Sequence, residues 1–163
     1  MFKKLIYILI ISSTFLSYNQ SFARTPLRDE LPPLERLSDL TIGVKRIEKG
    51  LKYEKKKKIK KAQKMFNEAI TFLLKANKNR KINSDIYFYL GFAYNKINNQ
   101  KNAIIYYNLG LVINPKDVNI NKHLGNIYLN NNNILEAKKL LKNIKNCNCN
   151  EYIELKSKID KFN

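Results

Sequence analysis

Residues suited to catalysis or to metal binding are scarce in this chain. Its 163 residues include one histidine, His123, and two cysteines, Cys147 and Cys149, and they contain no tryptophan. No HExxH metal pair, GxSxG nucleophile elbow or GxxxxGK[ST] phosphate loop is present. These absences argue against an enzyme. We therefore expect no catalytic residue, no metal site and no cofactor, and we expect His123 to be structural or exposed.

Acidic residues are also few, which leaves the chain strongly basic. The sequence has 31 lysines and arginines against 13 acids, a formal net charge of +18. Such a charge attracts nucleic acid, anionic lipid or acidic proteins without choosing among them. Lysine, asparagine and isoleucine dominate the composition and have A- and T-rich codons, so part of the charge can reflect genome composition. A predicted export from the cytoplasm makes nucleic acid a poor candidate partner.

Long apolar runs are missing, apart from one short run near the N-terminus that predicts this export. Two lysines precede the apolar residues 5–16, and Ser21 and Ala23 supply the small residues of a secretory cleavage site. The run is shorter than the roughly 20 residues that a membrane span needs. We predict a signal peptide at residues 1–23, a mature chain that begins at Arg24, and a periplasmic location in a Gram-negative bacterium. An uncleaved leader would instead anchor the protein in the membrane.

Strand-like alternation is missing as well, and helical periodicity takes its place. Residues 24–33 contain two proline sites and no sustained periodicity, so they are predicted to be an extended linker. Beyond them, apolar residues recur at steps of three and four, as on one face of an α-helix. The first such stripe begins at Leu34, and a second runs from about Ile59 to Ala76. The pattern predicts an all-helical domain over residues 34–163.

Glycine is rare, and two of the five glycines mark an internal repeat. Gly91 lies inside an amphipathic segment, where a glycine costs roughly 1 kcal/mol relative to alanine. Gly125 follows 34 residues later in the same local pattern. The two segments predict helix pairs over residues 84–117 and 118–151, with an asparagine-rich turn inside each pair.

The repeat resembles the tetratricopeptide repeat, a family of 34-residue helix-turn-helix units with the pattern W-x2-L-G-x2-Y, then A-x3-F, then P. The matching positions in this chain are Tyr87, Leu90, Gly91, Tyr94, Ala103, Tyr107 and Pro115, followed by Leu124, Gly125, Tyr128 and Ala137. The last unit departs from the pattern at Asn121, which stands at the aromatic position, and at Cys149, which stands at the proline position. A weaker unit precedes these two.

The resemblance implies a right-handed α-solenoid of about three stacked helix-turn-helix units. These units are expected at residues 43–76, 84–117 and 118–151. About seven extra residues lengthen or loop the join between the first unit and the second. A last apolar stripe predicts a capping helix over about residues 150–162, with Asn148 and Glu151 as its N-terminal capping box. We expect Gly91 and Gly125 where the two helices of one unit approach most closely.

In the family that this chain resembles, the first helices of the units line a groove that holds a peptide or a helix of another protein. The resemblance places seven residues at groove-facing positions: Asp85, Phe88, Phe92, Asn95, Lys122, Asn126 and Leu129. Phe88 and Phe92 could equally pack against a neighbouring helix. Lys122 and Asn126 share a helix face and resemble part of a carboxylate clamp. The function implied is a non-enzymatic protein–protein interaction scaffold or adaptor in the cell envelope.

Two further features favour other functions. Cys147 and Cys149 could form a local disulfide, stay free or bridge to another chain, or serve redox exchange or soft-metal binding. The lysine run Lys55–Lys61 falls across the turn of the first unit, where it is either a solvated surface or a contact for anionic lipid or an acidic partner. The alternatives to a scaffold are therefore an envelope thiol-redox or metal-handling protein and a basic membrane-surface protein.

Overall fold

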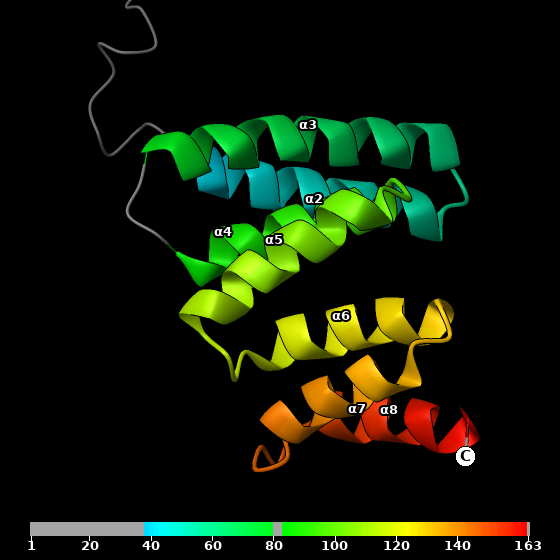
Figure 1. Ribbon diagram of the computed structural model, residues 1–163. Helices are drawn as coiled ribbons and strands as arrows, with labels where there is room; N and C mark the ends of the chain where they lie inside the picture. The colour runs from blue at the N-terminus through cyan, green and yellow to red at the C-terminus, as the bar shows by residue number, and fades with distance from the viewer. Residues whose placement is uncertain (1–37, 80–82, 163) are drawn as a thin grey trace, which may run out of the picture. The chain divides into compact units, whose positions relative to one another are not determined.

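The computed structural model describes residues 38–79 and 83–162, in which every regular element is helical (Figure 1). The elements are α2 (Asp39–Lys55), α3 (Ile59–Asn79), α4 (Ser84–Lys96), α5 (Gln100–Ile113), α6 (Val118–Asn130), α7 (Ile134–Asn143), α8 (Asn150–Ile159) and the 3₁₀ turn η1 (Asp160–Phe162). The predicted all-α class is confirmed. The signal peptide, the linker and the predicted helix start at Leu34 lie outside the described residues.

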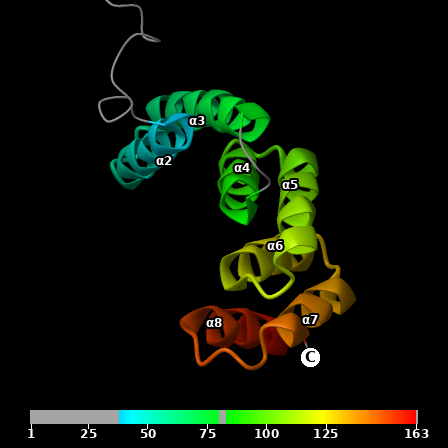
Figure 2. The same ribbon diagram turned by 90° about the vertical axis from the view of Figure 1, so that its left-hand side faces the viewer.

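The helices form three successive pairs followed by a single helix. α2 packs on α3, α4 on α5 and α6 on α7, and α8 packs on both α6 and α7. The first helices of successive pairs also contact one another. In Figure 2, α2, α4, α6 and α8 therefore lie along one side, here called the inner face, and α3, α5 and α7 lie along the opposite, outer face. This arrangement is an α-solenoid of three helix-turn-helix units with a C-terminal capping helix.

Each pair turns at a residue whose backbone is left-handed. The φ angle is 55° at Lys57, 62° at Asn98 and 56° at Asn132, and each residue lies two positions before the second helix of its pair. Asparagine tolerates this conformation better than most residues, which gives the asparagine-rich turns a local cause. The next amide in each turn donates to the carbonyl of a tyrosine five residues earlier: Tyr53, Tyr94 and Tyr128.

Side chains cap the starts of the four helices α2, α4, α5 and α6. Each capping oxygen accepts a hydrogen bond from a backbone N–H in or near the first turn, and the residues are Ser38, Asn83, Asn99 and Asp117. The capping box predicted for α8 is wrong. Cys149 is the N-cap residue and no side chain caps the helix. Because α8 begins one residue later than the box requires, Asn148 and Glu151 do not occupy the capping positions.

The extra residues between the first two units lengthen a helix. α3 has 21 residues, seven more than the 14 of α5. α4 then begins at Ser84, after residues 80–82, which are not described. The insertion therefore extends α3 along its own axis and leaves the spacing of the later pairs unchanged.

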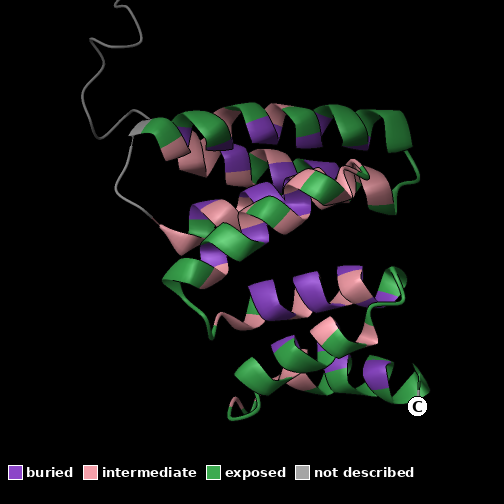
Figure 3. Cartoon of the chain, viewed as in Figure 1, coloured by how far each residue is buried: buried purple, intermediate pink, exposed green. Residues whose placement is uncertain are grey.

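The core is a series of three clusters that follow the helix pairs (Figure 3). Leu73 and Leu90 belong to the cluster formed by α2, α3 and α4. Tyr107 and Leu124 belong to the next cluster, and Leu155 of α8 belongs to the last. Each cluster includes residues of the unit or of the capping helix that follows, so no helix pair buries its apolar surface alone.

The two signature glycines lie at close approaches to different neighbours. A Cβ at Gly91 would lie 2.6 Å from the ring of Tyr107, on the second helix of the same unit, as predicted. A Cβ at Gly125 would lie 2.8 Å from a side-chain carbon of Leu155 in α8. The prediction that Gly125 faces the second helix of its own unit is therefore wrong, because α8 occupies the place beside this part of α6.

Candidate functional site

An apolar hollow lies between α2 and α4 on the inner face. The residues that line it are Val44, Ile47, Glu48, Leu51, Phe88, Tyr89 and Phe92. Ile47 is buried and the other apolar residues are half-buried, while Glu48 supplies the one charged side chain. Such a wall favours an apolar side chain of a bound partner, because the burial of apolar surface would be the main contribution to the free energy of binding there.

A polar hollow follows on the same face, between α4, α6 and the end of the chain. Its lining includes the amides of Asn95, Asn126 and Asn130 and the ammonium groups of Lys158 and Lys161. His123, Ile127, Leu129 and Phe162 complete the wall. None of these lining residues, all within the described chain, is acidic. The chemistry favours an anionic group, since ammonium and amide N–H groups donate charge-assisted hydrogen bonds to carboxylates.

Aromatic rings connect the two hollows. The ring of Phe92, in the wall of the apolar hollow, lies 5.4 Å from the ring of His123, in the wall of the polar hollow. The Phe88 ring lies 5.7 Å from His123, and the Tyr107 ring lies 6.2 Å from it. The sequence left open whether Phe88 and Phe92 face the groove or pack against a neighbouring helix, and in the structure both residues do both. They line a hollow on the inner face and they pack against the neighbouring helix.

His123 is uncharged in this environment at neutral pH. Burial lowers its pKa to about 4, and the ammonium groups of Lys122, Lys96 and Lys158 act in the same direction while Glu154 opposes them. Its ring neighbour Tyr107 is fully buried, and its hydroxyl has no hydrogen-bond partner among the described residues. Burial raises the pKa of Tyr107 far above its usual value, so both rings act as packing groups.

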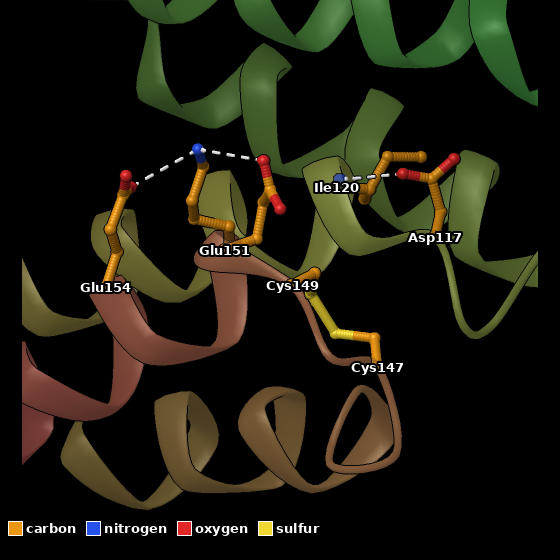
Figure 4. A network of polar contacts seen from close by, with 7 residues as sticks. Asp117, Ile120, Cys147, Cys149, Glu151 and Glu154 are labelled. Atoms are coloured by element: carbon orange, nitrogen blue, oxygen red, sulfur yellow. Dashed lines mark hydrogen bonds and ion pairs between the residues drawn. A yellow bond between two sulfur atoms is a disulfide. The ribbon is translucent and has the colours of Figure 1, made fainter.

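The residues predicted to form part of a carboxylate clamp are already engaged by α8. The Lys122 ammonium lies 3.4 Å from a carboxylate oxygen of Glu154 and 3.8 Å from one of Glu151 (Figure 4). Oδ1 of Asn126 accepts a hydrogen bond from Nζ of Lys158 at 2.8 Å. The side chain of Lys122 is only 17% exposed and lines neither inner-face hollow. The carboxylates that Lys122 binds therefore come from the chain itself, and the clamp assignment does not hold for it.

The remaining predicted groove residues have different positions. Asn95 and Asn126 line the polar hollow. Leu129 also borders it but is 4% exposed and packs with Leu155, so it supports the surface instead of presenting a side chain. Asp85 is exposed in the first turn of α4 and lines neither inner-face hollow.

The sequence prediction missed the contributions of the outermost inner-face helices. Val44 and Leu51 of α2 line the apolar hollow, and Lys158 and Lys161 at the C-terminal end line the polar one. The signal for them was indirect. If the capping helix continues the series of first helices, as α8 does beside α6, then its polar side must border the same face as α4 and α6.

Asn121, which replaces the aromatic residue of the repeat, is fully buried and hydrogen-bonded. Its Nδ2 donates to the carbonyls of Pro115, at 3.0 Å, and Asp117, at 2.8 Å. Its Oδ1 accepts a hydrogen bond of 3.0 Å from Nδ2 of Asn143 in α7. These bonds tie the loop before α6 to α7, and they satisfy an amide that would otherwise be costly to bury.

Cys147 and Cys149 form a disulfide directly before α8 (Figure 4). Among the described residues, no group of three or more His, Cys, Asp or Glu side chains could hold a metal ion. The side chains of Lys55–Lys61, which span the turn from α2 to α3, are exposed throughout. In the part of the chain that the structure describes, no helix has both the length and the apolar character needed to cross a membrane.

The geometry defines a helical-repeat protein, and comparisons with known proteins identify the repeat. Residues 84–117, the middle pair, match the family model described as "Tetratricopeptide repeat". No curated protein matches the chain in sequence. Residues 84–117 are therefore identified as a tetratricopeptide repeat within this helical array.

Among the solved structures that share the fold are two domains of known proteins. The first TPR of Spaghetti (RPAP3), bound to the HSP90 peptide SRMEEVD, is similar with a TM-score of 0.56 and 22% identity, over 76% of this chain and 94% of that one. The Sgt2 TPR domain from Aspergillus fumigatus is similar with a TM-score of 0.50 and 18% identity, over 74% of this chain and 78% of that one. The likeness extends the tetratricopeptide-repeat fold well beyond the matched residues 84–117.

Proposed function

We propose that this protein is a non-enzymatic scaffold that binds an extended peptide or a helix of a partner protein along its inner face. The observation that carries the proposal is that the two hollows are neighbours on the inner face. Phe92 borders the apolar hollow, and its ring contacts His123, which borders the polar hollow. A partner segment that follows this path would place an apolar side chain between α2 and α4 and an anionic group near Lys158 and Lys161.

The partner class follows from the chemistry of the two hollows. The apolar one offers little charge, and the polar one offers amide and ammonium donors. The Spaghetti TPR, which has a similar fold, is bound to the peptide SRMEEVD, a segment with apolar and acidic residues. This supports a peptide that combines both kinds of side chain as the partner here.

We also propose that the protein acts in the cell envelope, most simply in the periplasm. The support is the pattern of residues 1–23, in which two lysines, an apolar run and small residues follow one another as in a secretory leader. Mass spectrometry of the protein from the envelope fraction tests this location. A chain that begins at Arg24 is expected, and an intact Met1 would show an uncleaved anchor.

The test of the inner face is a crosslinking capture from the envelope, with Phe92→Ala and a matched control. Phe72 of α3 is the control, because both rings are half-buried and each has a lysine ammonium near it, at 5.6 Å for Phe92 and 5.5 Å for Phe72. We expect Phe92→Ala to lose the captured partner and Phe72→Ala to keep it. Capture of the same partner by both variants at equal yield would remove the inner face from the proposal.

A disulfide function remains a second candidate, since the structure pairs the only two cysteines of the chain. A variant with both Cys147→Ser and Cys149→Ser separates the two ideas. A scaffold keeps partner capture without the disulfide, because neither cysteine lines an inner-face hollow. A thiol-redox protein would lose its activity entirely.

A further inference from the structure

The outer side of α5 carries an exposed apolar stripe. Ile105, Leu109, Val112 and Ile113 are all exposed, Val112 by 81%, and their spacing places them along one side of the helix. Exposed residues recur along α5 in Figure 3. Only one residue of α5, Lys101, is charged. In a chain this rich in lysine, a stripe without charge indicates a surface that something apolar covers.

The stripe ends beside a basic hollow. Pro115 and Lys116 lie just after the end of α5, and they line this hollow together with Lys139 and Lys142 of α7 and with Lys145, which follows α7. Glu136 pairs with Lys139 at 2.6 Å. Within the described chain no acid pairs with the other three lysines, and Asp117 is occupied in capping α6. Three ammonium groups therefore adjoin the apolar stripe without a carboxylate to neutralise them.

We propose that the α5 stripe and this basic hollow together dock on the surface of an anionic lipid bilayer. The stripe would enter the boundary between headgroups and acyl chains, and the lysines would meet lipid phosphates, as in interfacial amphipathic segments. Figure 2 shows α5 between α3 and α7 on the outer face of the helix array, and the exposed stripe of α5 can meet a surface from that side. A second copy of this chain fits less well, because its lysines and its +18 charge would oppose the approach.

This docking surface is separate from the proposed peptide site. The stripe belongs to the outer face, and the two hollows of the proposed peptide site lie between inner-face helices. The inference therefore goes beyond the scaffold function and can fail or hold independently of it.

The experiment is co-sedimentation of the protein, as purified from the envelope, with phosphatidylcholine vesicles in which roughly a third of the lipid is phosphatidylglycerol. The test variant is Leu109→Gln with Val112→Gln. The control is Ile153→Gln, which removes a similarly exposed apolar side chain from α8. We expect the test variant to bind about tenfold more weakly and the control to bind as the native protein does. Circular dichroism of all three proteins is the folding control, and the same helix content is expected for each.

Salt and charge variants complete the test. Binding of the native protein should weaken as salt is raised, and Lys116→Gln with Lys142→Gln should flatten that dependence. Failure of the native protein to bind anionic vesicles, or equal binding by the stripe variant, overturns the proposal. Analytical ultracentrifugation that finds a native dimer, dispersed by the stripe variant, in a protein that ignores vesicles would assign the stripe to a second copy instead.

Discussion

The middle and last units carry the same signature but are packed by different chemistry. In the middle unit, Gly91 lies against the ring of Tyr107 on its own second helix, and His123 packs beside that ring. In the last unit, Gly125 lies against Leu155 of the helix that follows the unit, and ion pairs from Lys122 join the same helix. An aromatic ring therefore packs against the glycine of the middle unit, and an aliphatic side chain with ion pairs nearby packs against the glycine of the last unit.

This difference teaches what the signature glycine specifies. It fixes a place on the first helix where another side chain comes close, but it leaves open which helix provides that side chain. In the last unit α8 provides it. The capping helix is therefore a structural part of the last unit, and changes in α8 should act on that unit as core substitutions do.

The largest expected effect comes from filling the close approach in the middle unit. Gly91→Leu places a side chain where even a Cβ lies 2.6 Å from the buried Tyr107 ring. We expect a loss of at least about 3 kcal/mol in the free energy of unfolding, since the ring has no space to move into. Asn99→Leu in the nearby turn removes only a helix cap and should cost about 1 kcal/mol. Urea unfolding followed by circular dichroism measures both, and equal losses would contradict this account.

A slightly smaller effect is expected in the last unit, where Leu155 packs against Gly125. Leu155→Ala removes a fully buried side chain and should lower the free energy of unfolding by about 2–3 kcal/mol. Gly125→Ala alone crowds Leu155, which offsets the gain of about 1 kcal/mol that alanine brings to a helix, so it should be clearly stabilising only once Leu155 is alanine. A double-mutant cycle by urea unfolding measures this coupling. Strictly additive effects would show that α8 does not close the last unit.

The aromatic packing of the middle unit should make stability depend on pH through His123. Its folded-state pKa is lowered to about 4, so between the unfolded value and about pH 4 the unfolded chain binds a proton that the folded chain excludes. Stability is therefore complete above about pH 6.5 and is lost as pH falls toward about 4, by about 3 kcal/mol from this one group, since each pKa unit between the two states is worth about 1.4 kcal/mol. His123→Phe should remove that part of the slope. Unfolding curves of both proteins at several pH values test it, and identical slopes would contradict the buried position.

The smallest effect is expected from the charged contacts of the last unit. Lys122→Gln removes ion pairs with Glu151 and Glu154 that remain partly exposed, so it should cost less than about 1 kcal/mol, and less still at high salt. Lys139→Gln, which breaks an exposed pair within α7, is the matched control. Thermal unfolding at low and high salt compares the two. A salt-independent loss above about 2 kcal/mol for Lys122→Gln would mean that these contacts hold α8 in place.

The helix pairs were predictable from the sequence because their causes are local. Apolar stripes at helical spacing, the glycine and tyrosine signature, and asparagines in the turns each act within a few residues. The position of α8 was not predictable in the same way. The spacing within a unit does not state what lies beside the last one. Gly125 was therefore predicted to face the second helix of its own unit and Lys122 to face a partner, whereas both contact α8.

The candidate site was predictable only in part, since each hollow is built from helices far apart in sequence. The resemblance named Phe88, Phe92, Asn95 and Asn126 as groove residues, and in the structure these four line the hollows of the inner face. It missed the walls that α2 and the C-terminal end contribute. Those residues follow no repeat signature, and only the packing of one unit on the next brings them to the same face.

The left-handed turns show that the residues of this sequence do not all suit their backbone conformations equally well. The three turns share one backbone conformation, but the first uses Lys57 where the others use Asn98 and Asn132. An ordinary side chain in this conformation costs about 1 kcal/mol that glycine would avoid. Glycine at this position would avoid the cost without changing the fold, so the protein is less stable than its fold allows. This is typical of proteins that are selected only to stay above a threshold of stability. Selection has tolerated Lys57 within the lysine run Lys55–Lys61, although glycine would suit the left-handed backbone at this position better.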